Sequence, residues 1–272
     1  MTVAGLLPVL SAALNAFFLV AGVYIYVSLL RQIALRTPQV EVLEASPLRT
    51  FGWPEALLAT VLTTFFLLTI SGTGQHAVRM DNRDLIASAA LTTGLLLALA
   101  AFLRLRRFDL NSLGGFSKIG FFRTAITGGV LMLAAYPLIF LADVVTQRFL
   151  RHEPDRQAIV EMFSQSTTLS QRILIIVLAV SLAPIAEEFI FRFFFYGVAK
   201  RYFGRGIAVV VSSLLFAAVH AHLPSFAPLF VLGGCFAIAY EWSGSILVSM
   251  MMHALFNACT LTALAFPELG PP

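Results

Sequence analysis

Three charged residues lie inside one long apolar run, where charge is unfavourable. Residues 173–196 contain Glu187, Glu188 and Arg192 among aliphatic and aromatic side chains. A charge at the centre of a bilayer costs about 2.5–3.5 kcal/mol on insertion scales, so such residues are expected to have a function. Pro184 precedes them and lacks a backbone N–H, so it frees a helical carbonyl or kinks the helix.

Helical spacing gives the two glutamates different surroundings. Glu188 and Arg192 are four residues apart, so they share a face and can pair, and arginine can meet a carboxylate bidentately. Glu187 is rotated by about 100° from Glu188 and has no local cation. An unpaired carboxylate in an apolar setting is a candidate general base. The alternative is that all three charges form an ion network that only locks the helix in place.

Later apolar runs supply histidine and asparagine. His220 lies near the end of one run, and His253 and Asn257, four residues apart, share a helical face in the last run. A single histidine in an apolar run is most often a core residue. Two histidines, an asparagine and an unpaired glutamate on consecutive helices instead predict one shared site. Hydrolysis needs such groups: a proton acceptor for water and donors for a developing oxyanion. His222, at a loop edge, is interpreted as solvated.

The elements that position these residues must be membrane helices. The chain has 272 residues, of which 59% are hydrophobic and 12% charged, whereas soluble domains have about 45–50% and about 25%. This composition excludes an ordinary soluble enzyme and a nucleic-acid-binding module. It predicts an all-α, polytopic membrane helix bundle, a single membrane domain over residues 1–272. Apolar runs, judged against the roughly 20 residues of a spanning helix, suggest about eight transmembrane helices: 7–30, 55–70, 85–103, 121–145, 173–199, 207–219, 226–240 and 245–265.

The connections between the runs carry further information. Ile159, Met162 and Phe163 recur at helical spacing in the longest polar stretch, residues 146–172, and predict a short interfacial helix there. Counting lysine and arginine on alternate sides of eight spans gives roughly 11 against roughly 6. The positive-inside rule then predicts that both termini lie outside.

Several common catalytic motifs do not occur in the sequence. It contains no P-loop, GxGxxG, HExxH or GxSxG pattern. ATP hydrolysis, nicotinamide chemistry, HExxH-type zinc proteolysis and a serine nucleophile elbow therefore lack support.

Three short motifs occur in order, each within an apolar run: Glu187-Glu188-x-x-x-Arg192, Phe216-x-x-x-His220 and His253-x-x-x-Asn257. In this arrangement they resemble the motifs of the CPBP family, which comprises type II CAAX prenyl endopeptidases and bacteriocin-processing relatives. The resemblance covers the motif-bearing catalytic half, residues 173–260. Residues 1–150, which hold the first four helices, carry no motif that we recognise.

The resemblance implies a glutamate-type intramembrane endopeptidase that hydrolyses a hydrophobic, possibly prenylated, CAAX-type substrate. It gives the two glutamates different roles, in agreement with the roles that helical spacing suggests. The implied roles are water activation for Glu187 with His220, oxyanion stabilisation for His253 and Asn257, and support of the site for Glu188 with Arg192. No serine or cysteine nucleophile is required.

The expected cofactors and partners follow from these residues and from the resemblance. We expect no cofactor, with zinc as an alternative because a glutamate and two histidines can ligate it. The expected partners are a hydrophobic or lipidated peptide or protein and membrane lipid, with no nucleic acid. The protein should be integral and multi-pass, in the plasma membrane of a prokaryote or an internal membrane of a eukaryote. The rival function is a non-proteolytic transporter or scaffold, although the two related halves typical of transporters are not found.

Overall fold

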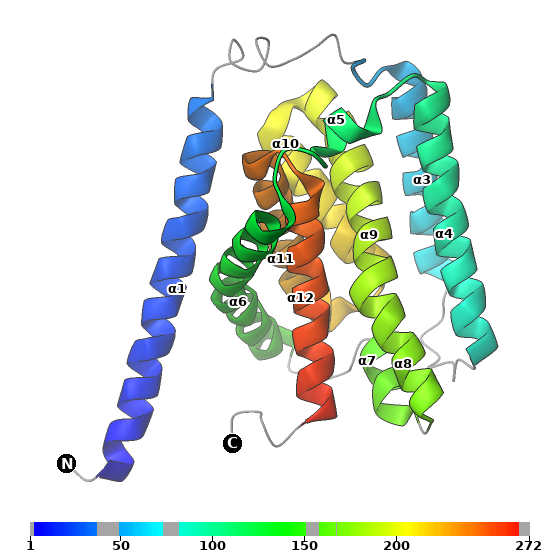
Figure 1. The fold of residues 1–272 in the computed structure, drawn as a ribbon. Coiled ribbons are helices and arrows are strands. Elements are labelled where there is room, and N and C mark those ends of the chain that lie inside the picture. The colour runs from blue at the N-terminus through cyan, green and yellow to red at the C-terminus, as the bar shows by residue number, and fades with distance from the viewer. Residues whose placement is uncertain (1–2, 37–48, 73–81, 151–157, 167, 267–272) are drawn as a thin grey trace.

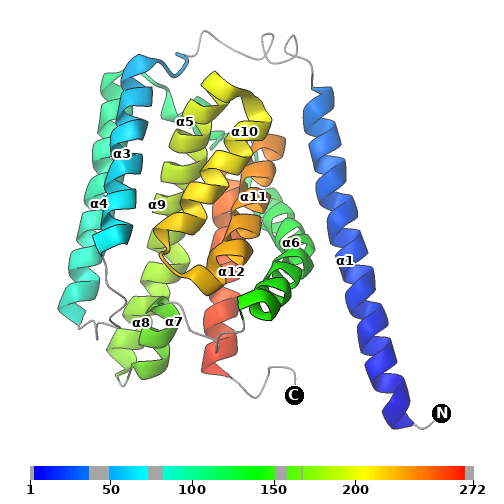
Figure 2. The same cartoon turned by 180° about the vertical axis from the view of Figure 1, so that it is seen from behind.

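The protein is a bundle of long helices. The computed structural model describes residues 3–36, 49–72, 82–150, 158–166 and 168–266, and these residues form helices and turns without any strand. The helices that carry the motifs stand in the centre of the bundle. The α3–α4 pair flanks them on one side, and α6, then α1, on the other (Figure 1, Figure 2). The predicted all-α fold is therefore confirmed.

Six long helices have simple bounds: α1 (Val3–Leu35), α3 (Trp53–Gly72), α4 (Asn82–Leu105), α6 (Phe121–Leu150), α11 (Phe226–Ser243) and α12 (Ile246–Ala265). Three elements are short: α5 (Leu110–Gly114), α7 (Ala158–Gln165) and the 3-10 turn η3 (Leu223–Ser225). Between them runs a composite helix made of α8 (Leu169–Val177), η1 (Leu178–Leu182), α9 (Ala183–Glu188), η2 (Phe189–Phe195) and α10 (Tyr196–Val219). In this composite, η1 and η2 are π-helical.

The composite helix folds back on itself at Gly204. Seven segments of the described chain are long and apolar enough to cross a membrane, and one of them, Leu169–Val219, has 51 residues. A straight helix of that length would be roughly 77 Å long, more than twice a hydrocarbon core of about 30 Å. Gly204 has φ 79° and ψ 172°, a conformation that glycine adopts readily. Two helices meet at this kink, and α10 turns back near one end of the bundle (Figure 2). The seven segments therefore contain eight helical arms, in agreement with the predicted number.

Aromatic side chains fill the core around the motif-bearing helices. All seven residues of η2 are buried, and six of them are apolar. The rings of Phe189 and Phe193 stack with centroids 4.8 Å apart, and Phe191 meets Phe216 of α10 edge to face at 5.6 Å. Offset and edge-to-face arrangements are the favourable geometries for aromatic pairs. The π-helical stretch is thereby held by packing on every side.

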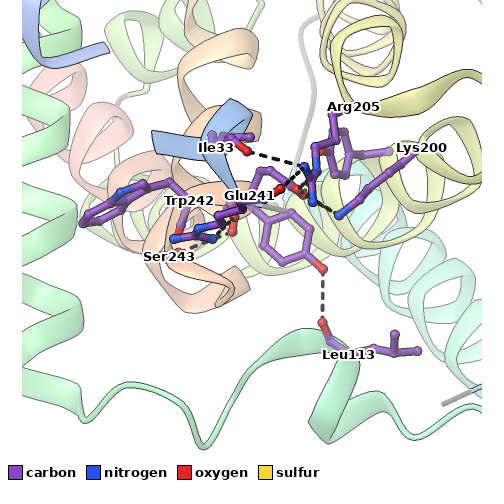
Figure 3. A network of polar contacts seen from close by, with 10 residues as sticks. Ile33, Leu113, Lys200, Arg205, Glu241, Trp242 and Ser243 are labelled. Atoms are coloured by element: carbon purple, nitrogen blue, oxygen red, sulfur yellow. Dashed lines mark hydrogen bonds and ion pairs between the residues drawn. The ribbon is translucent and has the colours of Figure 1, made fainter. Parts of the chain in front are cut away.

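A cluster of polar residues fixes the turn at Gly204. The Glu241 carboxylate, near the end of α11, accepts hydrogen bonds from Lys200 Nζ at 2.8 Å and from Tyr196 Oη at 2.8 Å. Arg205 Nε lies 2.9 Å from the same carboxylate (Figure 3). Lys200 and Arg205 flank the glycine, so one anion holds both arms of the hairpin. The sequence reading missed Glu241, whose signal is a lone carboxylate at the end of an apolar run.

The same cluster attaches α1 to the rest of the bundle. Arg36, just after α1, donates to the carbonyl of Trp242 at 2.7 Å and to that of Glu241 at 3.2 Å. Trp242 Nε1 donates to the Gln32 side-chain oxygen at 3.0 Å. Arg205 donates to the Ile33 carbonyl at 3.4 Å (Figure 3). These contacts tie the end of α1 to the turn between α11 and α12.

The polar stretch before the composite helix contains the predicted short helix. It is α7, and Phe163 on it is buried against Ile175 of the composite helix and Leu261 of α12. Arg172 donates to the Ser166 hydroxyl at 3.2 Å and to the Ser166 carbonyl at 3.3 Å, which fixes the connection from α7 to α8. The side chain of Ile159, also named in that prediction, lies outside the described residues.

The orientation of the bundle can be measured directly. The first turn of α1 and the last turn of α12 lie at the same end of the bundle (Figure 1), as an even number of passes requires. The lysine and arginine count predicts that this end faces outside. With Cys235 and Cys259 replaced by serine, a Gly270→Cys variant should react with an impermeant maleimide in intact cells. If labelling requires permeabilisation, both termini lie inside and the predicted orientation is wrong.

Candidate functional site

The hairpin brings Glu187 and His220 to the same depth. They lie 17 and 16 residues on either side of Gly204, so two helical arms of nearly equal length end at the same level. His220 Nε2 is 3.8 Å from Glu187 Oε2. From α12, His253 Nε2 approaches the same oxygen to 3.9 Å. The structure therefore joins three of the predicted site residues around a single carboxylate oxygen.

Glu188 lies on another face of the helix and is fully buried. Its Oε2 is 3.2 Å from Arg192 Nε, and both side chains are inaccessible to solvent. Its Oε1 is 3.0 Å from His253 Nδ1. The pairing predicted from four-residue spacing is confirmed, and one carboxylate joins a cation of its own helix to a histidine of α12.

Aromatic rings and one carbonyl complete the surroundings of Arg192. The guanidinium carbon lies 4.3 Å from the Phe216 ring centroid and 5.2 Å from that of Phe236, within the range of cation–π attraction. Its Nη2 donates to the Gly233 carbonyl at 3.2 Å. A β-carbon at Gly233 would lie 3.2 Å from the Phe216 ring and 3.3 Å from Nη2, so glycine lets α11 approach this closely.

Hydrogen bonds assign the tautomers of the two histidines. His220 Nδ1 lies 2.7 Å from the Phe216 carbonyl, which can only accept, so Nδ1 carries the proton. His253 Nδ1 faces the Glu188 carboxylate in the same way. In each neutral ring the Nε2 lone pair is therefore directed to Glu187. The hydrogen bond made by one ring nitrogen of a histidine sets the role that the other nitrogen can take.

The three facing atoms leave room for a water molecule. Separations of 3.8 and 3.9 Å are too long for direct hydrogen bonds, which span about 2.7–3.2 Å. Glu187 Oε2 has no hydrogen-bond partner among the described residues, while its side chain is 27% exposed. One water at about 2.8 Å could contact this oxygen and both Nε2 atoms at once. Because a water has two O–H groups, it can donate to two of these three atoms at a time, and the Glu187 oxygen and one histidine nitrogen can polarise it together.

Asn257 fills a gap in the helical hydrogen bonds at η1. In the π register the Ala183 N–H bonds to the Leu178 carbonyl, five residues earlier. The next donor in this register would be Pro184, which has no N–H, so the Ala179 carbonyl needs another partner. Asn257 Nδ2 supplies it at 2.7 Å. The carbonyl predicted to be freed by Pro184 is thus bound by the last residue of the third motif.

A cavity of about 510 Å³ contains all four of these polar side chains. Glu187, His220, His253 and Asn257 line it together with mostly apolar residues of the composite helix, α11 and α12. Two further walls come from elements without motifs: Ser88, Ala89 and Thr92 of α4, and Val160 and Met162 of α7.

The α4 wall was missed by the sequence reading. Leu85, Ala89 and Thr92 recur at helical spacing, but in a helix that is apolar on all sides this signal does not stand out. His222 is not among the lining residues. Its Nδ1 lies 2.7 Å from the Ser225 hydroxyl and accepts from the Ser225 N–H, at the start of η3.

The three side chains around Glu187 Oε2 are spaced more widely than zinc ligands. Zinc ligands lie about 2.0–2.1 Å from the ion and hence roughly 3.3 Å from one another in a tetrahedron. The Glu187 oxygen is 3.8 and 3.9 Å from the two nitrogens, and the described residues contain no group of three His, Cys, Asp or Glu side chains arranged to hold a metal ion. The residues as placed do not fit zinc, and we derive no step through a metal.

Together, the fold and the cavity define a multi-pass membrane protein with an acid–histidine cluster in its interior. Residues 169–259 match the family described as Rce1-like, type II CAAX prenyl endopeptidase Rce1-like. The matched segment is about a third of the chain and contains all three motifs. The resemblance to the CPBP family, whose members include CAAX-type intramembrane proteases, is therefore confirmed for this segment. Comparison with curated proteins and with solved structures finds no match.

The two glutamates should differ in their effect on stability. Glu188→Ala removes the partner of buried Arg192 and should lower the free energy of unfolding by about 3–5 kcal/mol. Glu187→Gln should leave it unchanged or raise it, because the replaced oxygen has no hydrogen-bond partner among the described residues. Thermal and chemical unfolding in detergent would measure both variants. Equal destabilisation would favour the alternative that all three charges form a structural network.

Proposed function

We propose that this protein is an intramembrane endopeptidase in which Glu187 and His220 activate a water molecule to hydrolyse a peptide bond. The observation that carries the proposal is the convergence of both histidine Nε2 atoms on Glu187 Oε2 inside the 510 Å³ cavity. The similarity of residues 169–259 to CAAX prenyl endopeptidases supports the same reaction class.

The first step is attack on the peptide carbonyl. A water held by Glu187 and His220 loses a proton to one of these acceptors as its oxygen bonds to the carbonyl carbon, and the carbonyl oxygen becomes an oxyanion. The accepted proton then passes to the leaving amine, the C–N bond breaks, and a carboxylic acid and an amine are released. Water is the only co-reactant, and neither serine nor cysteine takes part.

His253 and Asn257 are proposed to stabilise the oxyanion. His253 Nε2 faces the cavity while its Nδ1 is held 3.0 Å from the Glu188 carboxylate, so Nε2 can donate to an oxyanion once it has taken up a proton released by the attacking water. Asn257 uses one amide hydrogen on the Ala179 carbonyl and keeps a second. Loss of one such donor costs typically 10²–10³ in rate. On this proposal Glu188 and Arg192 do not contact the substrate and act by holding the His253 ring in position.

The cavity favours a hydrophobic substrate. Its walls are mostly apolar, and helices α4, α11 and α12 that form them lie within membrane-spanning segments. A peptide with apolar side chains or a lipid group near the scissile bond would bury apolar surface there, which is favourable. A prenylated CAAX tail is one member of this class and is the first substrate to test.

Loss of the base should abolish cleavage in a folded protein. Glu187→Gln and His220→Ala should each lower kcat by about 10²–10⁴, the usual contribution of a positioned acid or base. His222→Ala is the matched control, because this histidine is two residues away and does not line the cavity; it should stay within a few-fold of wild type. The assay is cleavage of prenylated and unprenylated CAAX peptides in proteoliposomes.

Two outcomes would contradict this assignment. Near-normal cleavage by folded Glu187→Gln would remove Glu187 as the base. Wild-type protein that is folded but cleaves no hydrophobic or lipidated peptide would favour the rival function, a transporter or scaffold that keeps the polar cluster.

Activity should not depend on added metal. The side chains that could ligate zinc are spaced for a bridging water, so purified enzyme should cleave after dialysis against strong chelators. Metal content measured by elemental analysis should not correlate with rate. Stoichiometric zinc, with activity lost on chelation and restored on zinc addition, would overturn the water-only mechanism.

A further inference from the structure

A second cavity lies on the reverse side of the catalytic helices. It has a volume of about 840 Å³ and is bounded by the link from α5 to α6, by the composite helix near η1, and by α12. Ser181 and Pro184 face it, whereas Leu182 and Ala183 face the catalytic cavity. On α12, Met251 and Ala254 face it, whereas His253 faces the catalytic cavity. An occupant would therefore lie directly behind the residues that position the site.

The occupant of this groove must come from the bilayer. Its lining is mostly apolar, and the flanking side chains Phe121 and Ile185 are 72% and 46% exposed within membrane-spanning segments. An apolar groove that opens to the hydrocarbon region fits an acyl chain. Met250 and Met251 on one wall have flexible, unbranched side chains that adapt to such a chain.

One polar atom in the groove wall lacks a partner. Thr124 is 3% exposed and lines the groove, and its Oγ1 has no hydrogen bond to any described residue. A buried hydroxyl without a partner is unfavourable, so such a group points to a ligand atom. The ester oxygens at the glycerol end of a phospholipid are acceptors of the right kind.

A cation marks the end of the groove where the headgroup would lie. Ser117 and Ile119 line the groove, and Lys118 between them is exposed. Its Nζ lies beside Gly244, just before α12; a β-carbon at Gly244 would be 3.2 Å away. The first N–H groups of a helix carry positive partial charge and favour anions. An ammonium group and a helix N-terminus together favour a phosphate.

We propose that this groove binds one anionic phospholipid, with an acyl chain along α9 and α12, an ester oxygen at Thr124 and the phosphate at Lys118. This goes beyond the proposed peptidase activity and does not depend on it. Lys118 lies at the end of the bundle with more lysine and arginine in its loops, and juxtamembrane basic residues attract anionic lipids.

Matched glycine variants test the acyl chain. At Gly120, in the groove lining just before α6, and at Gly129, within α6 but outside the lining, an added β-carbon meets nothing within 4 Å. Gly120→Leu should therefore add its side chain at the groove wall with no clash at the β-carbon, and Gly129→Leu is its control. By native mass spectrometry, wild type and Gly129→Leu should retain one phosphatidylglycerol, and Gly120→Leu should bind it at least tenfold more weakly.

Matched charge variants test the headgroup. Lys118→Gln should weaken phosphatidylglycerol binding about tenfold, whereas Arg201→Gln, an exposed cation at the same end of the bundle, should not. Phosphatidylcholine should bind at least tenfold more weakly to wild type, and excess inorganic phosphate should not displace the lipid. Phosphatidylglycerol should also raise the melting temperature of wild type but not of Gly120→Leu.

Three results would overturn the proposal. Unchanged binding by Gly120→Leu would show that the groove is not the acyl site. If Lys118→Gln and Arg201→Gln weaken phosphatidylglycerol binding equally, the lipid responds to general surface charge and not to a site at Lys118. Equal retention of phosphatidylcholine would remove the requirement for an anionic headgroup. If Gly120→Leu does not fold, the comparison of lipid binding by Lys118→Gln and by Arg201→Gln still tests whether the headgroup binds at Lys118.

Discussion

A buried carboxylate with two partners is the interaction on which the site depends. Glu188 is inaccessible to solvent, 3.2 Å from Arg192 and 3.0 Å from His253. Isolated charges at such a position would be strongly unfavourable, so the glutamate, the guanidinium and the aromatic rings around it must be assembled together. Because His253 belongs to α12, this requirement also fixes how α12 packs on the composite helix, and it sets the orientation of the ring directed to Glu187.

The second constraint is the length of the composite helix. A helix of 51 residues is too long to cross a bilayer once, and the reversal at Gly204 divides it into two arms that place Glu187 and His220 side by side. Glu241 holds both arms at the turn, far from the cavity, through Lys200 and Arg205. The polar cluster at one end of the bundle thus determines the alignment of the acid and base near its middle.

Irregular helical geometry occurs where the chemistry is proposed. Two π-helical stretches flank the six residues of α9 that end in the two glutamates, and such distortions are frequent at functional sites. At the first of them, Asn257 binds the carbonyl that Pro184 leaves without a donor. A residue assigned to the oxyanion therefore also maintains the helix, so loss of Asn257 combines a structural and a chemical effect.

The sequence by itself determined the local features: the membrane helices, the pairing of Glu188 with Arg192 four residues on, and the motifs behind the family resemblance, which the comparison confirms. The roles of the site residues stay predictions. Only the tertiary structure decided the contact of Glu188 with His253, that of Asn257 with Ala179, and the α4 wall of the cavity. The physical reason is that lipid-facing and core-facing surfaces of membrane helices are both apolar, so periodicity does not reveal which faces meet. Helix pairing is instead set by small residues, buried polar groups and turns, whose partners are distant in the chain.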